Sequence, residues 1–232
     1  MMTNKLPLLS LFLLLWGCQS SDHSPQTADK AIFATHQDLN HKVDSEEAKA
    51  GLLHLFPDIP DADFDSIFNH YPSYISDGFD FSVGKPNAEG YYKALYFGQK
   101  RHLGEDWNGE GGGNTDLGDP VYTSGNGLVI FSRHVCCGWG NVVRIVHRLR
   151  NHPEYKYIET VYAHLDKRQV EVGDMVYRGK QIGTIGTADG KYSAHLHLEA
   201  RNFTNMSLGP GYSDDHFGYM DPTEFIKAHR PK

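Results

Sequence analysis

Apolar and polar residues follow two different patterns along the chain, and the change lies near residue 79. In residues 31–78, apolar positions recur at helical spacing in two stretches, one that ends at Pro57 and one that runs from about Asp61 to Pro72. The second stretch would bury three apolar side chains, Phe64, Ile67 and Phe68. Residues 31–78 are therefore predicted to form a small helical appendage.

Residues 79–232 carry short β-rich runs separated by turns that contain Gly and Asn. Because no helical periodicity lies between these runs, the pattern favours an antiparallel, mainly β domain over β-α-β units. A short helix with Pro222 in its first turn is expected to close the domain. The expected strands are Val121–Ser124, Leu128–Ser132, Asn141–His147, Tyr157–His164, Asp174–Tyr177, Gln181–Thr187 and His195–Ala200.

The N-terminus indicates export from the cytoplasm. Lys5 precedes eleven residues, Leu6–Trp16, that are mostly apolar, which is short of the roughly 20 needed to span a bilayer as a helix. The run is typical of a secretory signal. It leads into Leu-Trp-Gly-Cys, which resembles the lipobox of bacterial lipoproteins. The resemblance implies that residues 1–17 are removed and that Cys18 is lipidated.

Residues 18–30 are polar and Ser-rich, so they are expected to form a flexible tether. Gln19 follows Cys18 in place of the Asp associated with inner-membrane retention in enteric bacteria. For a Gram-negative source this favours an outer-membrane anchor that faces the periplasm. A plain secretory signal with an incidental Cys18 is the alternative.

Charge and cysteine content narrow the class of protein. The chain has 22 Lys and Arg against 29 Asp and Glu, a formal charge of −7, which excludes a basic nucleic-acid binder.

Cys136 and Cys137 are adjacent, and Cα atoms about 3.8 Å apart are closer than the usual disulfide range of about 4.4–6.8 Å. They are expected to be free or strained, near a loop, without a catalytic role.

The chain has an unusually high number of His residues, fourteen, and the spacing of some of them suggests a metal site. On a strand, His195, His197 and Glu199 would share one face. His102 and Asp106 lie four residues apart upstream. Two His and one Asp form a ligand set that leaves the fourth tetrahedral position of Zn²⁺ to water. The chain has no H-E-x-x-H, so a thermolysin-like zinc helix is excluded.

The order of these elements is more specific than any one of them, and it resembles peptidase family M23, also called LytM or lysostaphin-like. These are zinc metallopeptidases that cut the peptide part of bacterial peptidoglycan. The resemblance covers about residues 79–226. The motifs that carry it are His102-x-x-x-Asp106, Gly118-Asp119-Pro120-Val121-Tyr122, Gly125-Asn126-Gly127-Leu128-Val129, Gly140 to His147, Tyr162-Ala163-His164-Leu165, Val172-Gly173-Asp174-x-Val176-x-x-Gly179-x-x-Ile182-Gly183 and His195-Leu196-His197-Leu198-Glu199.

The resemblance implies an antiparallel β-sheet catalytic domain of the LytM type, a duplicated hybrid motif, and a role for each matching residue. His102, Asp106 and His197 match the zinc ligands, while His164 and His195 match the two catalytic His that do not bind zinc. Protonated His164 is a candidate for stabilising the oxyanion. Which of the two acts as the general base is left open.

Glu199 either orients a zinc ligand or is simply the next residue on its strand face.

The loop Gly109–Asp116 departs from the commonest pattern of the family. It contains four Gly in five positions and is expected to rim the zinc cleft, with a role in substrate fit. It half resembles a calcium-binding nonapeptide turn, but one copy cannot build a stacked β-roll.

The expected function is that of a lipid-anchored zinc endopeptidase that hydrolyses stem or cross-bridge peptides of peptidoglycan. The alternative is a non-catalytic LytM-like regulator that binds and activates another cell-wall hydrolase. The sequence leaves open which bond is cut, and whether residues 31–78 block the cleft or brace the domain.

Overall fold

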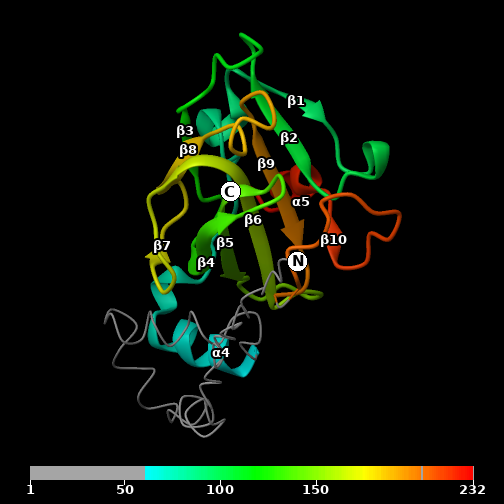
Figure 1. The fold of residues 1–232 in the computed structure, drawn as a ribbon. Coiled ribbons are helices and arrows are strands. Elements are labelled where there is room, and N and C mark those ends of the chain that lie inside the picture. The colour runs from blue at the N-terminus through cyan, green and yellow to red at the C-terminus, as the bar shows by residue number, and fades with distance from the viewer. Residues whose placement is uncertain (1–60, 205, 232) are drawn as a thin grey trace, which may run out of the picture. The chain divides into compact units, whose positions relative to one another are not determined.

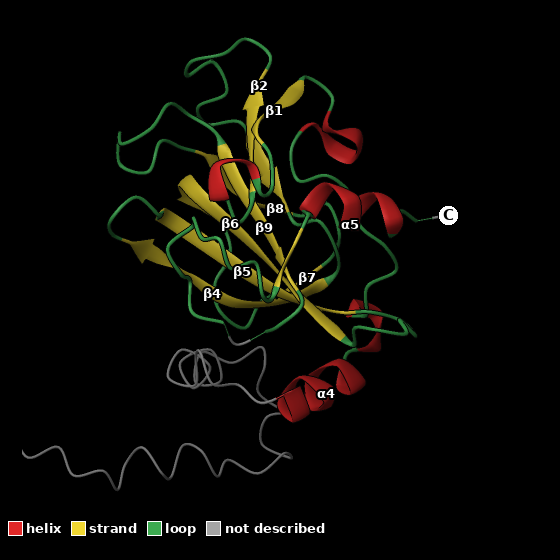
Figure 2. Cartoon of the chain, turned by 90° about the vertical axis from the view of Figure 1, so that its right-hand side faces the viewer, coloured by secondary structure: helices red, strands yellow, loops and turns green. Residues whose placement is uncertain are grey.

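The computed structural model describes residues 61–204 and 206–231. Within them the strands form a single antiparallel sheet of ten strands, in the order β1-β2-β9-β6-β5-β4-β7, with β10 paired to β9 and β3 joined through β8 to β6 (Figures 1 and 2). The mainly β, antiparallel fold class is confirmed. The strands are β1 (Tyr91–Leu95), β2 (Glu105–Gly109), β3 (Pro120–Tyr122), β4 (Gly127–Val135), β5 (Gly140–Arg148), β6 (Tyr157–Arg168), β7 (Met175–Val176), β8 (Gln181–Ile185), β9 (Leu196–Arg201) and β10 (Tyr219–Met220).

The seven predicted strands are all present, but three strands were not predicted. β1, β2 and β10 are short, with five, five and two residues, and β2 reads Glu-Asp-Trp-Asn-Gly, a composition with low strand propensity. Pairing with β9 on one side and β1 on the other holds β2 in the sheet. Tertiary pairing therefore overrides local propensity in the strand that carries Asp106.

The sheet has an apolar core on each face, because successive side chains of a strand point to opposite sides. Val129 and Ile145 join a cluster that continues through Leu196 and Leu198 of β9. Leu128 and Val146, one residue along on the same two strands, pack in a second cluster with the helix α4 (Asp61–His70). The alternation of neighbouring residues thus builds both clusters.

Helix α4 contributes Phe64, Ile67 and Phe68 to the second cluster. In Figure 2 this helix lies below the strands. Phe64 and Phe68 are fully buried, and their rings lie 5.6 and 6.0 Å from the ring of Tyr157. The predicted helix from about Asp61, with these side chains on its buried face, is confirmed. The other predicted helix, together with residues 1–17, 18–30 and 31–60, lies outside the described residues.

Helix α5 (Pro222–Ala228) confirms the predicted C-terminal helix. The Asp221 side chain accepts a hydrogen bond from the Glu224 amide at 2.9 Å, which caps the first turn. Pro222 occupies the first turn, where its missing amide hydrogen costs nothing. Phe225 and Ile226 bury the opposite side of the helix in the main core.

Among the described residues no helix is long and apolar enough to cross a membrane.

Cys136 and Cys137 are joined by a disulfide in the turn between β4 and β5. The sequence-based expectation left open whether these thiols are free or bonded, and the structure has them bonded. Cys137 has a φ of +69°, a left-handed conformation that a turn of this kind uses. The pair therefore belongs to the turn.

Candidate active site

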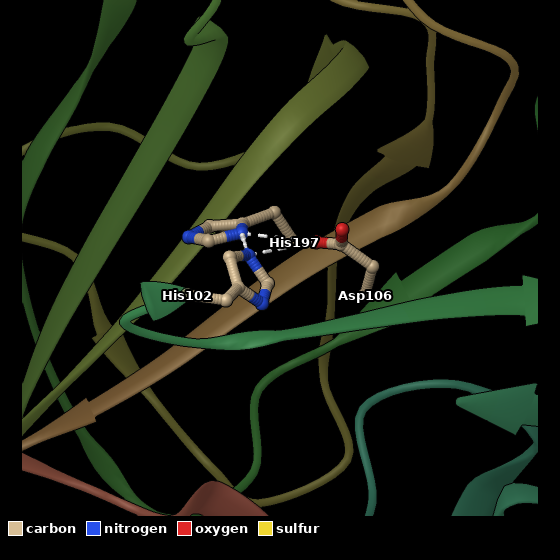
Figure 3. Close-up of side chains that lie close together, drawn as sticks. All are labelled: His102, Asp106 and His197. Atoms are coloured by element: carbon tan, nitrogen blue, oxygen red, sulfur yellow. Dashed lines mark hydrogen bonds and ion pairs between the residues drawn. The ribbon is translucent and has the colours of Figure 1, made fainter. Parts of the chain in front are cut away.

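Three side chains, two from neighbouring strands and one from the segment before them, meet at one point (Figure 3). Asp106 of β2 lies directly opposite His197 of β9 in the antiparallel register, and His102 lies three residues before the start of β2. His102 Nε2 lies 2.9 Å from His197 Nδ1 and 3.3 Å from Asp106 Oδ1, and the third distance, His197 Nδ1 to Asp106 Oδ1, is 3.1 Å. The fold thus brings residues 102, 106 and 197 together.

Gly104 is required for this approach between the two strands. A Cβ atom at this position would lie 2.5 Å from the carbonyl oxygen of Leu198 and 2.9 Å from Cε1 of His197. Real Cβ atoms do not approach other atoms so closely, so any larger residue would push the two strands apart. Close packing against β9 therefore explains the Gly in the middle of the His-x-Gly-x-Asp motif.

The donor set fits a zinc ion. Four ligands at about 2.0–2.1 Å in a tetrahedron are separated from one another by about 3.3 Å, close to the three distances found here. His197 Nε2–H donates to Glu199 Oε1 at 3.0 Å, which leaves the Nδ1 lone pair directed at the other two donors. Two imidazoles and one carboxylate leave one tetrahedral position for water or substrate.

Opposite charges stabilise the pair formed by Asp106 and His197. Burial by itself raises the pKa of Asp106, but hydrogen bonds from His102 and His197 outweigh it and hold that pKa far below its usual range. Burial lowers the pKa of His197, but the carboxylates of Asp106 and Glu199 raise it to about 9. The pocket therefore attracts positive charge, as a cation site must.

Behind His197 lies a buried network of ion pairs. The Glu199 carboxylate accepts hydrogen bonds from His197 and, at 2.8 Å, from Arg201 Nε. Arg201 Nη1 lies 3.7 Å from Glu159, which forms a two-pronged pair with Arg144 at 2.6 and 2.8 Å. Burial raises the pKa of Glu199, but Arg201 and His197 lower it below the ordinary value. Glu199 is thus an ionised acceptor at the back of the candidate ligand.

His164 and His195 complete the group of side chains at this point. Their rings lie 4.7 Å apart, and His195 Nε2 is 3.6 Å from Asp106 Oδ1. His195 Nδ1–H donates to the Ser193 carbonyl at 2.8 Å, and His164 Nδ1–H donates to the Trp139 carbonyl at 3.2 Å. In both rings Nε2 is then the atom with a free lone pair.

A bulge in β6 aims His164 at the site. Residues 143 and 141 of β5 pair with residues 162 and 165 of β6, so β6 has one extra residue between these pairs. His164 has a φ of +64°, which turns its side chain away from strict alternation. Burial, with His197 and His195 nearby, lowers the pKa of His164 to about 3. This lowering of the pKa favours a neutral His164 imidazole. The expectation of a protonated His164 that stabilises the oxyanion stays a prediction.

Four of the candidate residues, Asp106, His164, His195 and His197, line a small cavity of about 100 Å³. Aromatic side chains that the sequence did not single out line its walls, namely Trp139, Tyr192 and Tyr212, and Cys137 joins them at the disulfide turn. The only sequence signal for them is proximity, since Trp139 stands in a Gly-Trp-Gly turn and Tyr192 lies three residues before His195.

The Gly-rich loop does not rim the cavity. No residue between 109 and 118, all of which the structure describes, is among those that line it. The loop instead contacts the segment that precedes β9, so the expectation that it rims the site is not met at this cavity. Its expected role in substrate fit stays a prediction.

Comparisons with known proteins point to one family. The family model described as Peptidase family M23 matches residues 101–210. The peptidoglycan DD-endopeptidase ShyA of Vibrio cholerae is 39% identical over 83 residues, which are 36% of this chain and 17% of ShyA. The lipoprotein NlpD of Yersinia enterocolitica is 30% identical over 93 residues, 40% of this chain and 87% of NlpD. The structure of lysostaphin from Staphylococcus simulans aligns with a TM-score of 0.45 at 23% identity, over 60% of this chain and 50% of lysostaphin.

NlpD apart, the curated relatives are much longer than the segment they share with this chain, which spans 13% to 30% of their length. The similarity thus concerns the segment around the candidate site.

Proposed function

The chain belongs to peptidase family M23, and from this membership and the geometry of the site we propose that it is a zinc metalloendopeptidase of bacterial peptidoglycan. The bonds it hydrolyses are peptide bonds of the stem or cross-bridge peptides. One observation carries the proposal: three donor atoms converge within 3.3 Å of one another, and His164 and His195 open onto the same cavity.

In this proposal His102 Nε2, Asp106 Oδ1 and His197 Nδ1 hold the zinc ion. When bound, zinc supplies Lewis-acid chemistry, which lowers the pKa of a water molecule and polarises a carbonyl group. Glu199 holds the ring of His197 in the tautomer that presents Nδ1. Without this acceptor the ring could rotate or protonate at the wrong nitrogen.

His195 carries the proton in this proposal. Its Nδ1–H is held by the Ser193 carbonyl, so Nε2 can take a proton from the attacking water and return it to the leaving amine. Nε2 also lies next to the metal donors, 3.6 Å from Asp106. His164, neutral and with Nε2 free, accepts a hydrogen bond from the water or the substrate and thereby orients it.

We further propose that the protein is a cell-envelope lipoprotein anchored through Cys18, with an outer-membrane anchor that faces the periplasm in a Gram-negative cell. The support is the lipobox-like sequence at Cys18 and a relative, NlpD, that is named a lipoprotein.

The described part of the appendage, α4, packs on the second core cluster, and none of its residues lines the cavity. This favours a brace over a plug for residues 61–70.

Digestion of purified peptidoglycan tests the enzyme against the alternative of a non-catalytic regulator. We expect the intact protein to release peptides with new amino termini, detected by mass spectrometry, and His195→Ala to release almost none while it keeps about one zinc per chain. His197→Ala should lose both zinc and hydrolysis.

His70→Ala, an exposed residue of α4, is the control and should behave as the intact protein does. Absence of cleavage by intact, zinc-loaded protein on several wall types would overturn the enzyme and favour the regulator.

A further inference from the structure

The Gly-rich loop connects β2, which carries Asp106, with β3, and the proposed mechanism gives it no task. The loop is held in one conformation by its own hydrogen bonds. Asp116 is buried and accepts from the Gly109 amide at 2.9 Å, and the Thr115 hydroxyl donates to the Gly112 carbonyl at 2.8 Å. Gly112 and Gly113 have φ of +69° and +58°, values that Gly adopts without strain. This turn directs Asn114 back towards the sheet.

Two Asn side chains, Asn108 at the end of β2 and Asn114 within the loop, bind the same residue of another segment. Asn114 Oδ1 accepts from the Ala194 amide at 2.8 Å, and Asn108 Nδ2 donates to the Ala194 carbonyl at 3.2 Å. Ala194 is fully buried, so its backbone groups have no water to bond with. The loop and the end of β2 thus together satisfy both backbone groups of the residue directly before His195.

These bonds fix two successive peptide planes on either side of Ala194. In the first plane the amide bonds to Asn114, and the carbonyl of Ser193 accepts from Nδ1–H of His195. In the second plane the carbonyl bonds to Asn108, and the His195 amide bonds to the Gly186 carbonyl at 3.2 Å. Because a peptide unit is planar, holding one edge orients the other. Asn114 therefore orients the carbonyl that holds the His195 ring.

From this geometry we propose that Asn114 and Asn108 are positioning residues that set the orientation and tautomer of the His195 imidazole. The Gly-rich loop acts as a brace for the active site. This inference rests on the proposed catalytic role of His195, but the orientation of the ring can be measured without activity.

One Asn side chain accepts its hydrogen bond and the other donates, so substitution by Asp has opposite effects at the two positions. Asn114 accepts a hydrogen bond, so Asn114→Asp keeps the interaction and Asn114→Ala removes it. Asn108 donates, so both Asn108→Ala and Asn108→Asp remove it, and the carboxylate of Asn108→Asp would face the Ala194 carbonyl. A loop that served only as packing would not distinguish Asp at position 114 from Asp at position 108.

The first measurement is the ring ¹⁵N spectrum of His195 in the full chain with zinc bound. We expect Asn114→Ala and the two Asn108 variants to lose the Nδ1–H signal pattern or to broaden it, and Asn114→Asp to keep it. Asn126→Ala is the matched control, because this buried Asn holds the backbone carbonyls of Ser73 and Ile75. It should leave the His195 signals unchanged.

The second measurement is the rate of peptidoglycan hydrolysis with the same proteins. Misplacing a catalytic group by about 1 Å costs up to about 100-fold. We expect a roughly 10- to 100-fold lower kcat for Asn114→Ala, Asn108→Ala and Asn108→Asp. KM should change by less than about threefold, zinc should stay near one per chain, and Asn114→Asp should keep most of the activity.

Unchanged His195 signals in Asn114→Ala would overturn the inference, as would the same spectral change in Asn126→Ala. If Asn114→Ala does not fold, Asn114→Asp and Asn108→Asp decide the question by their contrast. If the His195 signals respond as expected but no variant and no intact protein cleaves peptidoglycan, the brace is supported and the proposed function fails.

Discussion

At the scale of single residues, the direction of each ring nitrogen determines what a His can do. His197 presents Nδ1 to the other donors because Glu199 takes the hydrogen of Nε2, and His195 presents Nε2 because Ser193 takes the hydrogen of Nδ1. The sequence places these two His on one strand, two residues apart. Their different partners give them different roles.

Removal of the Glu199 charge tests this at the residue scale. We expect Glu199→Gln to weaken zinc binding roughly 10- to 100-fold, because the amide is a weaker acceptor for the His197 ring and leaves Arg201 partly unpaired. The dissociation constant can be measured by competition with a chromogenic chelator. Glu224→Gln, at an exposed pair with Lys227, is the control, and equal zinc affinity in both variants would contradict the role of Glu199.

At the scale of elements, the polar side of β9 is buried together with its apolar side. Leu196 and Leu198 pack in the main core, and His197, Glu199 and Arg201 point the other way. Arg201 donates to the carbonyls of Ser207 and Leu208, in the segment that leads to the cavity wall at Tyr212. The ion-pair network therefore ties this wall to the strand that carries the site.

The helix α4 is expected to act as a brace, and Phe68 is the residue to test. Phe68→Ala removes a fully buried ring from the second core cluster and should lower the free energy of unfolding by about 3–5 kcal/mol. Urea denaturation measures the loss. At temperatures where the variant is folded we expect hydrolysis near the level of the intact protein. A large rise in activity would instead mean that the appendage blocks the site.

At the scale of the whole molecule, stability should depend on pH through His147. This residue is fully buried, donates Nδ1–H to the Asn126 carbonyl at 2.8 Å and has its Nε2 2.7 Å from Thr160 Oγ1. Burial lowers its pKa to about 4. Below the unfolded pKa near 6.5 the unfolded chain binds a proton that the folded protein does not, so stability is complete above pH 6.5 and falls as pH drops towards 4.

The size of this effect follows from the two pKa values. A difference of 2.5 units corresponds to about 3 kcal/mol by pH 4. Urea titrations give the free energy of unfolding at each pH. Between pH 7 and pH 4 this free energy should fall less steeply with decreasing pH for His147→Gln than for the intact protein. Parallel slopes for the two proteins would contradict the assignment of His147 as a neutral buried group.

The sequence by itself determined the β-rich class, because turn residues and period-two alternation are local signals, and it pointed to residues 102, 106, 164, 195 and 197 through the order of short motifs. Only the tertiary structure decided the strand status of β2, the bulge at His164, the aromatic walls and the ring tautomers. These depend on partners far apart in the chain, such as Asn114, which follows β2, and Ala194, which precedes β9; they meet because the sheet pairs β2 with β9. Local patterns carry no record of such pairs, so sequence reasoning did not predict that the Gly-rich loop binds the residue before His195.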